Sequence, residues 1–189
     1  MRRNYRIGIL IAACLIAAIS LFAADQSGAF LPGWIRWEES RTEGASPGDP
    51  EVMVLKGKTL QVFSGKETVW QTDRDVLVQS SLWCDINHDG AGELVLLCWK
   101  QGRYGGSRPF WVEEDEDSWS QHISIYQWTG ETMRPLWMAS DLGMEVEEWA
   151  FDETKRLVLT DRTGRVTAWD WRTWGLTNIP LTESQPVQK

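Results

Sequence analysis

Residues 85–97 read DINHDGAGELVLL, and this stretch decides the fold. Oxygen-bearing side chains stand at alternate positions and are followed by a glycine and a further carboxylate: Asp85, Asn87, Asp89, Gly90 and Glu93. A hard cation such as Ca²⁺ takes about six to eight oxygen ligands at roughly 2.3–2.6 Å, and a short acidic turn bent at a glycine supplies them. The apolar run after the turn predicts a strand, so the stretch indicates a hairpin with an ion-binding turn.

Two sequence patterns recur along the chain and place this hairpin in a repeat. An apolar–any–apolar–aromatic pattern occurs at 60–63, 123–126 and 166–169, and an apolar run precedes each copy at 52–55, 94–97 and 157–159. Successive copies lie about 42 or 63 residues apart, and both long intervals contain 101–120, a segment rich in Gly, Pro and acidic residues. Removing an insertion of about twenty residues leaves a common period of about 42–43 residues.

A period of roughly 40–45 residues with four strands per unit is typical of propeller blades. We therefore expect an all-β domain over 34–181, built from three propeller-like blades with an insertion at 101–120. In the first blade the expected strands are 34–38, 51–55, 59–63 and 68–71, with a polar loop at 39–50. In the second they are 76–84, 93–100, 122–128 and 133–139, and in the third 146–151, 157–160, 165–171 and 175–179. Closed propellers have about 4–8 blades, so three blades predict an open arc, self-assembly or completion by a partner. A two-sheet β-sandwich fits the same strand spacing and is the alternative.

The N-terminal segment is hydrophobic. Three arginines lie within residues 1–6, and residues 7–24 then run for eighteen positions without a charge, which matches the roughly 17–25 residues of a membrane-spanning helix. The distribution of positive charge predicts a single-pass anchor at 1–24 with a cytoplasmic N-terminus, a linker at 25–33, an extracytoplasmic domain and a disordered tail at 182–189. A cleaved signal peptide and a lipoprotein modified at Cys14 are alternatives, and both also export the domain.

The charge of the chain limits the classes of binding partner, and the positions of its cysteines bear on whether it forms a disulfide. The chain has a formal charge of −8, and beyond the three N-terminal arginines 16 basic residues face 27 acidic ones. Such a surface repels nucleic acid and anionic lipid and is compatible with cations. The expected pairing of the central hairpin offsets Cys84 from Cys98 by four residues, so we expect no disulfide between them.

The motif Asp-x-Asn-x-Asp-Gly-x-x-Glu at 85–93, followed by Leu-Val-Leu, resembles the FG-GAP/VCBS repeat family. Repeats of this family build the β-propellers of integrin α-subunits and of many bacterial surface proteins, with a Ca²⁺ loop between the first two strands of a blade. By this resemblance, Ca²⁺ would be bound by four side chains and one backbone carbonyl: those of Asp85, Asn87, Asp89 and Glu93, and that of Ala91. The other two units lack the motif, and a metal-free Asx/Gly hairpin turn is the alternative.

The insertion at 101–120 is the candidate ligand-binding segment, because long loops on rigid scaffolds often carry function. It contains arginine and aromatic residues, which are enriched in binding hot spots: Arg103, Tyr104, Arg108, Phe110, Trp111 and Trp119. The alternative is a loop that folds over its blade through these aromatics. Tryptophans in the strand pattern are expected to pack between sheets: Trp128, Trp137, Trp169, Trp171 and Trp174.

The motifs of catalysis are missing from the sequence, which has no Ser/His/Asp constellation, no CxxC and no phosphate-binding loop. We therefore expect a membrane-anchored, extracytoplasmic, non-catalytic module with one structural Ca²⁺ that binds a protein or glycan of the cell envelope. One alternative is a structural subunit that completes a larger propeller or envelope assembly, including a homo-oligomer. The other is a hydrolase of the cell wall or of polysaccharide, for which paired carboxylates would suffice.

Overall fold

The computed structural model describes residues 2–46, 48–102, 116–138 and 142–180. The chain divides into two compact units, Met1–Ile35 and Arg36–Lys189. The predicted tail at 182–189 lies outside the described residues.

The first unit contains the helix α1 (Arg2–Gln26). Gly28 ends the helix in the left-handed conformation with a φ of 68°. Its N–H donates to the Asp25 carbonyl at 2.9 Å, and the Ala29 N–H donates to the Ala24 carbonyl at 2.9 Å. These two bonds form a Schellman cap, which satisfies carbonyls that the last turn leaves without helical partners. In the described part of the chain, no helix reaches the combination of length and apolarity that crossing a membrane demands.

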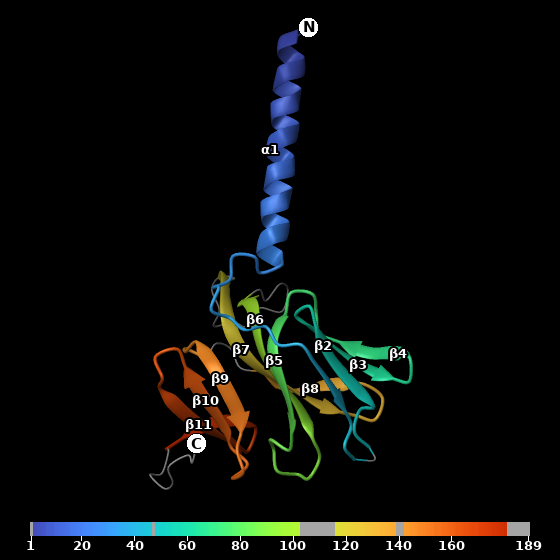
Figure 1. The fold of residues 1–189 in the computed structure, drawn as a ribbon, viewed down its shortest axis with the longest axis vertical. Coiled ribbons are helices and arrows are strands. Elements are labelled where there is room, and N and C mark those ends of the chain that lie inside the picture. Colours follow the sequence, from blue (N-terminus) through green and yellow to red (C-terminus); the bar gives the residue numbers. More distant parts are fainter. Residues whose placement is uncertain (1, 47, 103–115, 139–141, 181–189) are drawn as a thin grey trace. The chain divides into compact units, whose positions relative to one another are not determined.

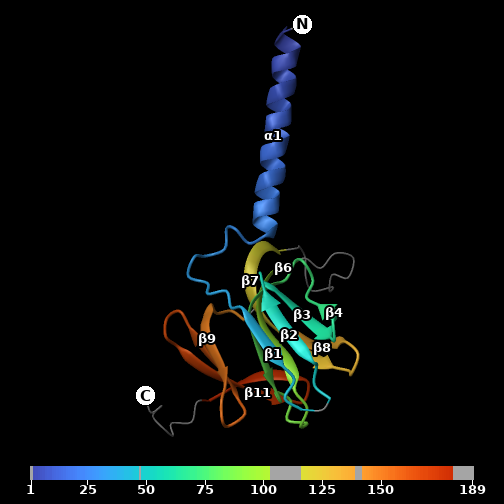
Figure 2. The same cartoon turned by 45° about the vertical axis from the view of Figure 1, so that its right-hand side comes forward.

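The second unit is built from three antiparallel sheets of four consecutive strands each (Figures 1 and 2). The N-terminal sheet contains β1 (Ser40–Glu43), β2 (Val52–Lys56), β3 (Thr59–Ser64) and β4 (Glu67–Gln71). The middle sheet contains β5 (Leu77–Cys84), β6 (Glu93–Gly102), β7 (Glu116–Trp128) and β8 (Met133–Met138). The C-terminal sheet contains β9 (Val146–Phe151), β10 (Leu157–Asp161), β11 (Val166–Arg172) and β12 (Gly175–Ile179). The all-β class and the three four-stranded units of the sequence prediction are thus confirmed.

Two details of the strand prediction are wrong. The predicted opening strand at 34–38 is not a strand, and β1 lies inside the segment predicted as a polar loop, where Arg41 pairs with Val54 of β2. All four residues of β1 are exposed, so no apolar alternation marks it. The insertion is also shorter than 101–120, because the strand ladder continues to a pairing of Gly102 with Glu116.

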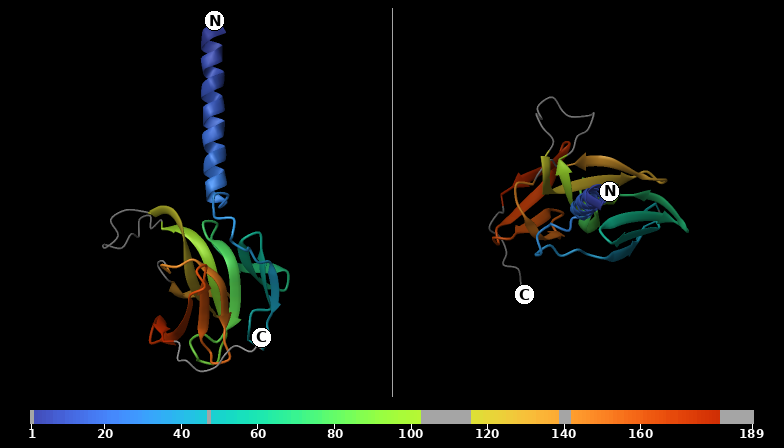
Figure 3. Two further views of the ribbon diagram at one scale, coloured as in Figure 1. Left: turned by 60° about the vertical axis from the view of Figure 1, so that its left-hand side comes forward. Right: turned by 90° about the horizontal axis from the view of Figure 1, so that it is seen from above.

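The middle sheet contributes to both hydrophobic cores, and Figure 3 shows the three sheets from two further directions. Leu94 and Leu96 of β6 pack with the N-terminal sheet, whereas Val95 and Leu97 of the same strand pack with the C-terminal sheet. Successive side chains of a strand point to opposite faces. The uninterrupted apolar run of β6 is therefore explained by burial on both faces, as in strands that are covered from either side.

Tryptophans fill much of the space around these cores, with one exception to the prediction. Trp128 packs against the first core, and Trp137, Trp169 and Trp171 pack against the second. Trp174 is instead 77 % exposed in the turn between β11 and β12. The prediction for Trp174 is wrong because this residue lies in the turn after β11 and is not part of the strand's alternation of buried and exposed positions.

The three cysteines are free thiols, in agreement with the expected lack of a disulfide. Cys84 pairs with Glu93 across the hairpin, whereas Cys98 pairs with Val78 after a register shift between Val78 and Ser80. This irregularity moves Cys98 two positions further along β5 than the partner predicted for it, Ser80.

Candidate functional site

The acidic turn joins β5 to β6, the first two strands of the middle sheet. Its backbone bends at two left-handed residues, His88 with a φ of 64° and Gly90 with a φ of 92°. The Asn87 Oδ1 accepts the Asp89 N–H at 2.9 Å, and the Asp89 Oδ1 accepts the Ala91 N–H at 2.8 Å. Such side-chain-to-backbone bonds two residues apart are Asx turns, so residues of the loop itself contribute to its shape.

Glu93 lies at the base of the turn and is fully buried. Its Oε2 accepts the Ile86 N–H at 3.1 Å, and its Oε1 accepts from the Asn87 side-chain amide at 3.1 Å. Burial raises the pKa of the Glu93 carboxyl to about 7, and the neighbouring negative charges of Asp89 and Asp85 add to the rise. The turn therefore concentrates negative charge around a carboxylate that is shielded from water.

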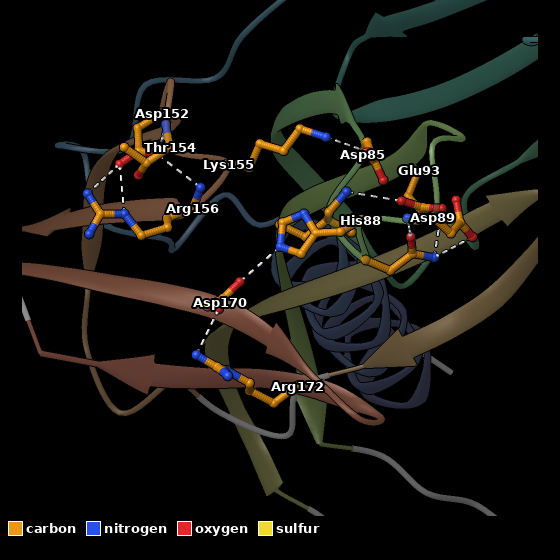
Figure 4. Close-up of polar contacts among 12 residues, drawn as sticks. Asp85, His88, Asp89, Glu93, Asp152, Thr154, Lys155, Arg156, Asp170 and Arg172 are labelled. Atoms are coloured by element: carbon orange, nitrogen blue, oxygen red, sulfur yellow. Dashed lines mark hydrogen bonds and ion pairs between the residues drawn. The ribbon is translucent and has the colours of Figure 1, made fainter.

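Two contacts from the C-terminal sheet hold this turn (Figure 4). The Lys155 ammonium, in the turn between β9 and β10, donates to Asp85 Oδ2 at 2.9 Å. The His88 Nε2 lies 2.9 Å from Asp170 Oδ1 on β11. Burial raises the pKa of Asp85, but the hydrogen bonds from Lys155 and from the Gly90 N–H outweigh burial and place the pKa below its ordinary value.

The donor set of the turn fits a hard cation by its chemistry. Side-chain oxygens of Asp85, Asn87, Asp89 and Glu93, with the Ala91 carbonyl, are the ligand types that Ca²⁺ takes. The Lys155 ammonium already acts as a stand-in cation at Asp85. The Asn87 amide turns its nitrogen toward Asp89 Oδ2 at 2.9 Å and toward Glu93. Within the described ranges, no three His, Cys, Asp or Glu side chains converge to hold a metal. Because the amide nitrogen of Asn87 faces these two carboxylates, the amide would have to rotate to offer its oxygen to a bound ion.

In the corresponding turn of the C-terminal sheet, between β9 and β10, the aspartate is paired with residues of the same turn. Asp152 Oδ1 accepts the N–H groups of Thr154 and Arg156, each at 2.9 Å. Asp152 Oδ2 accepts from the Arg156 guanidinium at 2.9 and 3.1 Å. An internal arginine thus compensates this acid, while the neighbouring Lys155 points away to Asp85.

A second site is a pocket of about 290 Å³ at the end of the face that β6 and β7 share with the C-terminal sheet. Its lining comes from both strands and from the segment before β9: Trp99, Trp119, Ser120, Gln121, Gly143, Met144 and Glu145. Trp99 pairs with Gln121, and Gln101 pairs with Trp119. Both tryptophans therefore lie on one face of the sheet, beyond the buried residues Leu97 and Ile123.

A hydrogen-bond network fixes the floor of this pocket. The Gln79 Oε1 accepts both from Trp99 Nε1 and from the Gln121 amide, each at 2.8 Å. The Gln121 Oε1 accepts the Val146 N–H at 2.6 Å, and its amide donates to the Val146 carbonyl at 3.0 Å. Gln121 thus pairs with the backbone of β9 and ties the middle sheet to the C-terminal sheet.

Trp119 is the residue through which the structure connects the predicted ligand-binding segment to this pocket. Its Nε1 is buried, and none of the described residues accepts its proton. The other five predicted contacts lie outside the described residues: Arg103, Tyr104, Arg108, Phe110 and Trp111. Sequence reasoning missed Gln79 and Gln121. The signal for Gln121 is an amide at a strand position between the apolar residues Trp119 and Ile123, whereas Gln79 lies at the register shift of β5, which no sequence pattern marks.

Comparisons with protein-family models, with curated proteins and with solved structures returned no match. The resemblance to FG-GAP/VCBS repeats therefore rests on the motif at 85–93 and on the repeat pattern.

Nucleophiles near these sites are held in unreactive environments. Burial raises the pKa of the Cys84 thiol to about 12, with further contributions from Glu93 and Asp85. Burial likewise raises the pKa of the Cys98 thiol to about 11. Because the thiolate is the nucleophilic form, both side chains are inert at neutral pH. Ser120 Oγ lies 2.9 Å from Nε2 of His122, which is 4 % exposed.

Proposed function

We propose that this protein is a membrane-anchored, extracytoplasmic, non-catalytic β-repeat module that binds a glycan or protein of the cell envelope and carries one structural Ca²⁺. In this proposal the three sheets are blades of an open, propeller-like arc of FG-GAP/VCBS type. A β-sandwich arrangement of the sheets is the competing description. The observation that carries the binding function is the pocket at Trp119, which two tryptophans and Gln121 line.

The anchor rests on residues 7–24, which carry no charge and follow three arginines. These residues lie within α1, and its large apolar side chains Leu15, Ile19 and Phe22 are 58–68 % exposed. An exposed apolar helix is stable when lipid covers it. Alkaline carbonate extraction of membranes tests the anchor: the full chain should stay in the pellet, and a chain that begins at residue 25 should be released.

The binding role is supported by the hydrogen bonds of the pocket's lining residues Trp99 and Gln121 and by Trp119, which belongs to the predicted ligand-binding segment. Ligand sites combine an apolar lining with a few fixed polar groups, and Trp99, Trp119 and Gln121 supply that combination. Glycan arrays and capture of envelope proteins test the role together. Binding should be lost in Trp111→Ala or Trp119→Ala and kept in Trp174→Ala, and full binding by both of the first two variants would contradict the proposal.

The Ca²⁺ proposal rests on the oxygen ligands of the acidic turn and on the buried Glu93 carboxyl. When bound, Ca²⁺ would neutralise the carboxylates of Asp85, Asp89 and Glu93 and would rigidify the turn that joins the first two strands of the middle sheet. A ligand that binds only the folded state raises the unfolding midpoint by mass action. Unchanged midpoints in EDTA and in excess Ca²⁺ would remove Ca²⁺ from the proposal and leave a hydrogen-bonded turn.

A second candidate function is that of a subunit that completes a larger β assembly. The observation that favours it is the asymmetry of the cores, in which the middle sheet contributes to two clusters and each outer sheet to one. Sheets with an uncovered face or edge are sites for further pairing. Sedimentation velocity separates the candidates, because a concentration-dependent oligomer supports completion by self-assembly and a clean monomer supports the binding module.

A further inference from the structure

The last strand of the C-terminal sheet, β12, has an open outer edge. It pairs with β11 from Ala168–Ile179 to Arg172–Gly175 and has no second neighbour in the sheet. Every second residue of an antiparallel strand turns its N–H and C=O groups away from the neighbouring strand. In the described part of the chain, no backbone group from outside the sheet bonds to β12. A row of donors and acceptors is therefore available to another strand.

The other edge strands carry features that oppose such pairing. Natural proteins protect sheet edges with charged residues, with proline or with a covering segment. Charged residues lie on β1, β4 and β9, and β8 contains Pro135. The Glu38 N–H donates to the Gln79 carbonyl of β5 at 2.9 Å, so part of that edge is already bonded. In contrast, β12 reads Gly-Leu-Thr-Asn-Ile and has neither a charge nor a proline.

The turn before β12 presents an aromatic side chain to solvent. Thr173 and Trp174 form a two-residue turn that the pairing of Arg172 with Gly175 closes. Thr173 has a φ of 50°, a left-handed conformation that is an outlier for a β-branched residue. Such strain clusters at functional positions. Trp174 is 77 % exposed, and exposed indoles of this kind are typical anchors of protein interfaces.

We propose that the outer edge of β12 pairs with β12 of a second copy of this chain. The formal charge of −8 opposes contact between two copies over most of their surface, but two β12 strands bring no charges together. Antiparallel pairing about a two-fold axis makes the contact self-complementary. With full overlap, Thr177 faces Thr177 of the other copy. Trp174 then lies opposite Pro180, which is exposed at the end of the strand.

This inference rests on the second candidate function and names the surface through which two copies join. It is compatible with ligand binding, because no residue of β11 or β12 lines the pocket at Trp119. A five-residue edge is short, and interfaces below about 1,200 Å² are typical of weak contacts, so we expect a reversible dimer. Confinement of both chains to one membrane raises their effective concentration, under which a weak edge contact suffices.

The test is energy transfer between full chains in phosphatidylcholine liposomes. One population carries a donor dye and the other an acceptor dye at the N-terminus, and the protein-to-lipid ratio is varied. Wild type should show saturable transfer that reverses when unlabelled chain is added. Trp174→Ala should weaken the association about tenfold, as expected for the loss of an aromatic anchor.

A charge exchange at Thr177, an exposed position in the middle of β12, identifies the partner strand. Thr177→Lys and Thr177→Glu each place like charges opposite one another, so each alone should weaken the association about tenfold. Donor-labelled Thr177→Lys mixed with acceptor-labelled Thr177→Glu should regain transfer, because opposite charges then face each other. Thr68→Lys is the matched control at an exposed threonine of the edge strand β4 and should behave like wild type. Thermal melts by circular dichroism check that every variant folds.

Three outcomes overturn the inference. Transfer that is unchanged in Thr177→Lys and Trp174→Ala places the contact on another part of the chain and leaves the second candidate function standing. Failure of the mixed Thr177 variants to regain transfer contradicts pairing with a second β12. If wild type stays monomeric at every ratio, the inference and the second candidate function fall together, and capture of an extended peptide by that monomer would assign the edge to a foreign strand.

Discussion

The Nζ of Lys155 lies 2.9 Å from Oδ2 of Asp85 and joins the β9–β10 turn to the β5–β6 turn. The two residues stand 70 positions apart in the chain. Asp85 is the first ligand of the proposed Ca²⁺ loop, so the ammonium group occupies one oxygen that the ion would claim. A single contact therefore links the two sheets and sets up competition between a tethered cation and a diffusible one.

Lys155→Met tests this competition. Without Ca²⁺, the variant should lose no more than about 1 kcal/mol of unfolding free energy, because the lysine is largely exposed and exposed ion pairs contribute roughly 0–1 kcal/mol. With the competitor removed, Ca²⁺ should bind about tenfold more tightly, since a nearby positive charge no longer opposes the ion. Calorimetric titration with Ca²⁺ measures the affinity, and chemical denaturation in EDTA measures the stability.

The matched control for this prediction is Lys66→Met, which changes an exposed lysine in the β3–β4 turn. It should alter neither quantity. Equal Ca²⁺ affinity in wild type and Lys155→Met would show that the ammonium does not compete. Binding by the variant alone would show that Lys155 replaces the ion in the native protein.

Glu93→Gln should make the stability difference from wild type depend on pH. Burial raises the pKa of Glu93 from an ordinary 4.5 to about 7. Below pH 4.5 the carboxyl is protonated in both folded and unfolded states, so the two proteins should differ little. Between pH 4.5 and 7 only the folded state retains the proton, and wild-type stability falls relative to the variant as the pH rises, by about 3 kcal/mol in total.

Denaturation curves from pH 4 to 8 in EDTA measure this difference, and the other acids cancel in the comparison. Excess Ca²⁺ at pH 7.5 should reverse the order, because the ion binds the carboxylate of wild type and not the amide of the variant. A difference that stays constant with pH would mean that Glu93 titrates normally.

Gly175→Ala should be destabilising because a Cβ at this position would meet the indole ring of Trp137. Gly175 opens β12 in the C-terminal sheet and Trp137 lies on β8 of the middle sheet, so the contact crosses between sheets. Overpacking of this kind costs about 1–3 kcal/mol, measured by urea denaturation. Gly92→Ala should behave in the same way against Trp83, whereas Gly33→Ala, with open space around its Cβ, should be silent.

Gln121→Ala should cost about 2 kcal/mol of stability, because it leaves the N–H and carbonyl of Val146 without their partner in a buried site. The exposed amide pair of Gln61 and Gln71 provides the control. Gln71→Ala should change stability by less than about 0.5 kcal/mol. Equal effects of the two substitutions would show that water replaces the Gln121 amide at no cost.

The sequence predicted strands well where apolar residues alternate or run continuously. The four strands of the C-terminal sheet were predicted to within one residue, and in β10 the alternation is visible because Leu157 and Leu159 are buried while Val158 between them is not. The strand β1 was missed because its pairing with β2 uses backbone groups alone and buries none of its side chains. An exposed edge strand that pairs only through its backbone produces no hydrophobic pattern in the sequence.

The two sites differ in how far the sequence could predict them. The position of the acidic turn between β5 and β6 follows from nine consecutive residues. The partners Lys155 and Asp170 lie 70 and 82 positions from the residues they contact, and no local pattern encodes such distances. The same holds for the pocket, where Trp119 was singled out by residue type but Gln79 and Gln121 depend on the packing of two sheets.

Each sheet consists of four strands that follow one another in the chain, and each core cluster joins sheets that are neighbours in sequence. Hairpins close over short loops, so most of the ordering entropy is lost in local steps. The N-terminal sheet can therefore form before the C-terminal sheet has been synthesised, and the middle sheet can nucleate on it. A chain arranged in this way assembles by addition from one end, and its last sheet should be the first to open when the protein is pulled from its C-terminus.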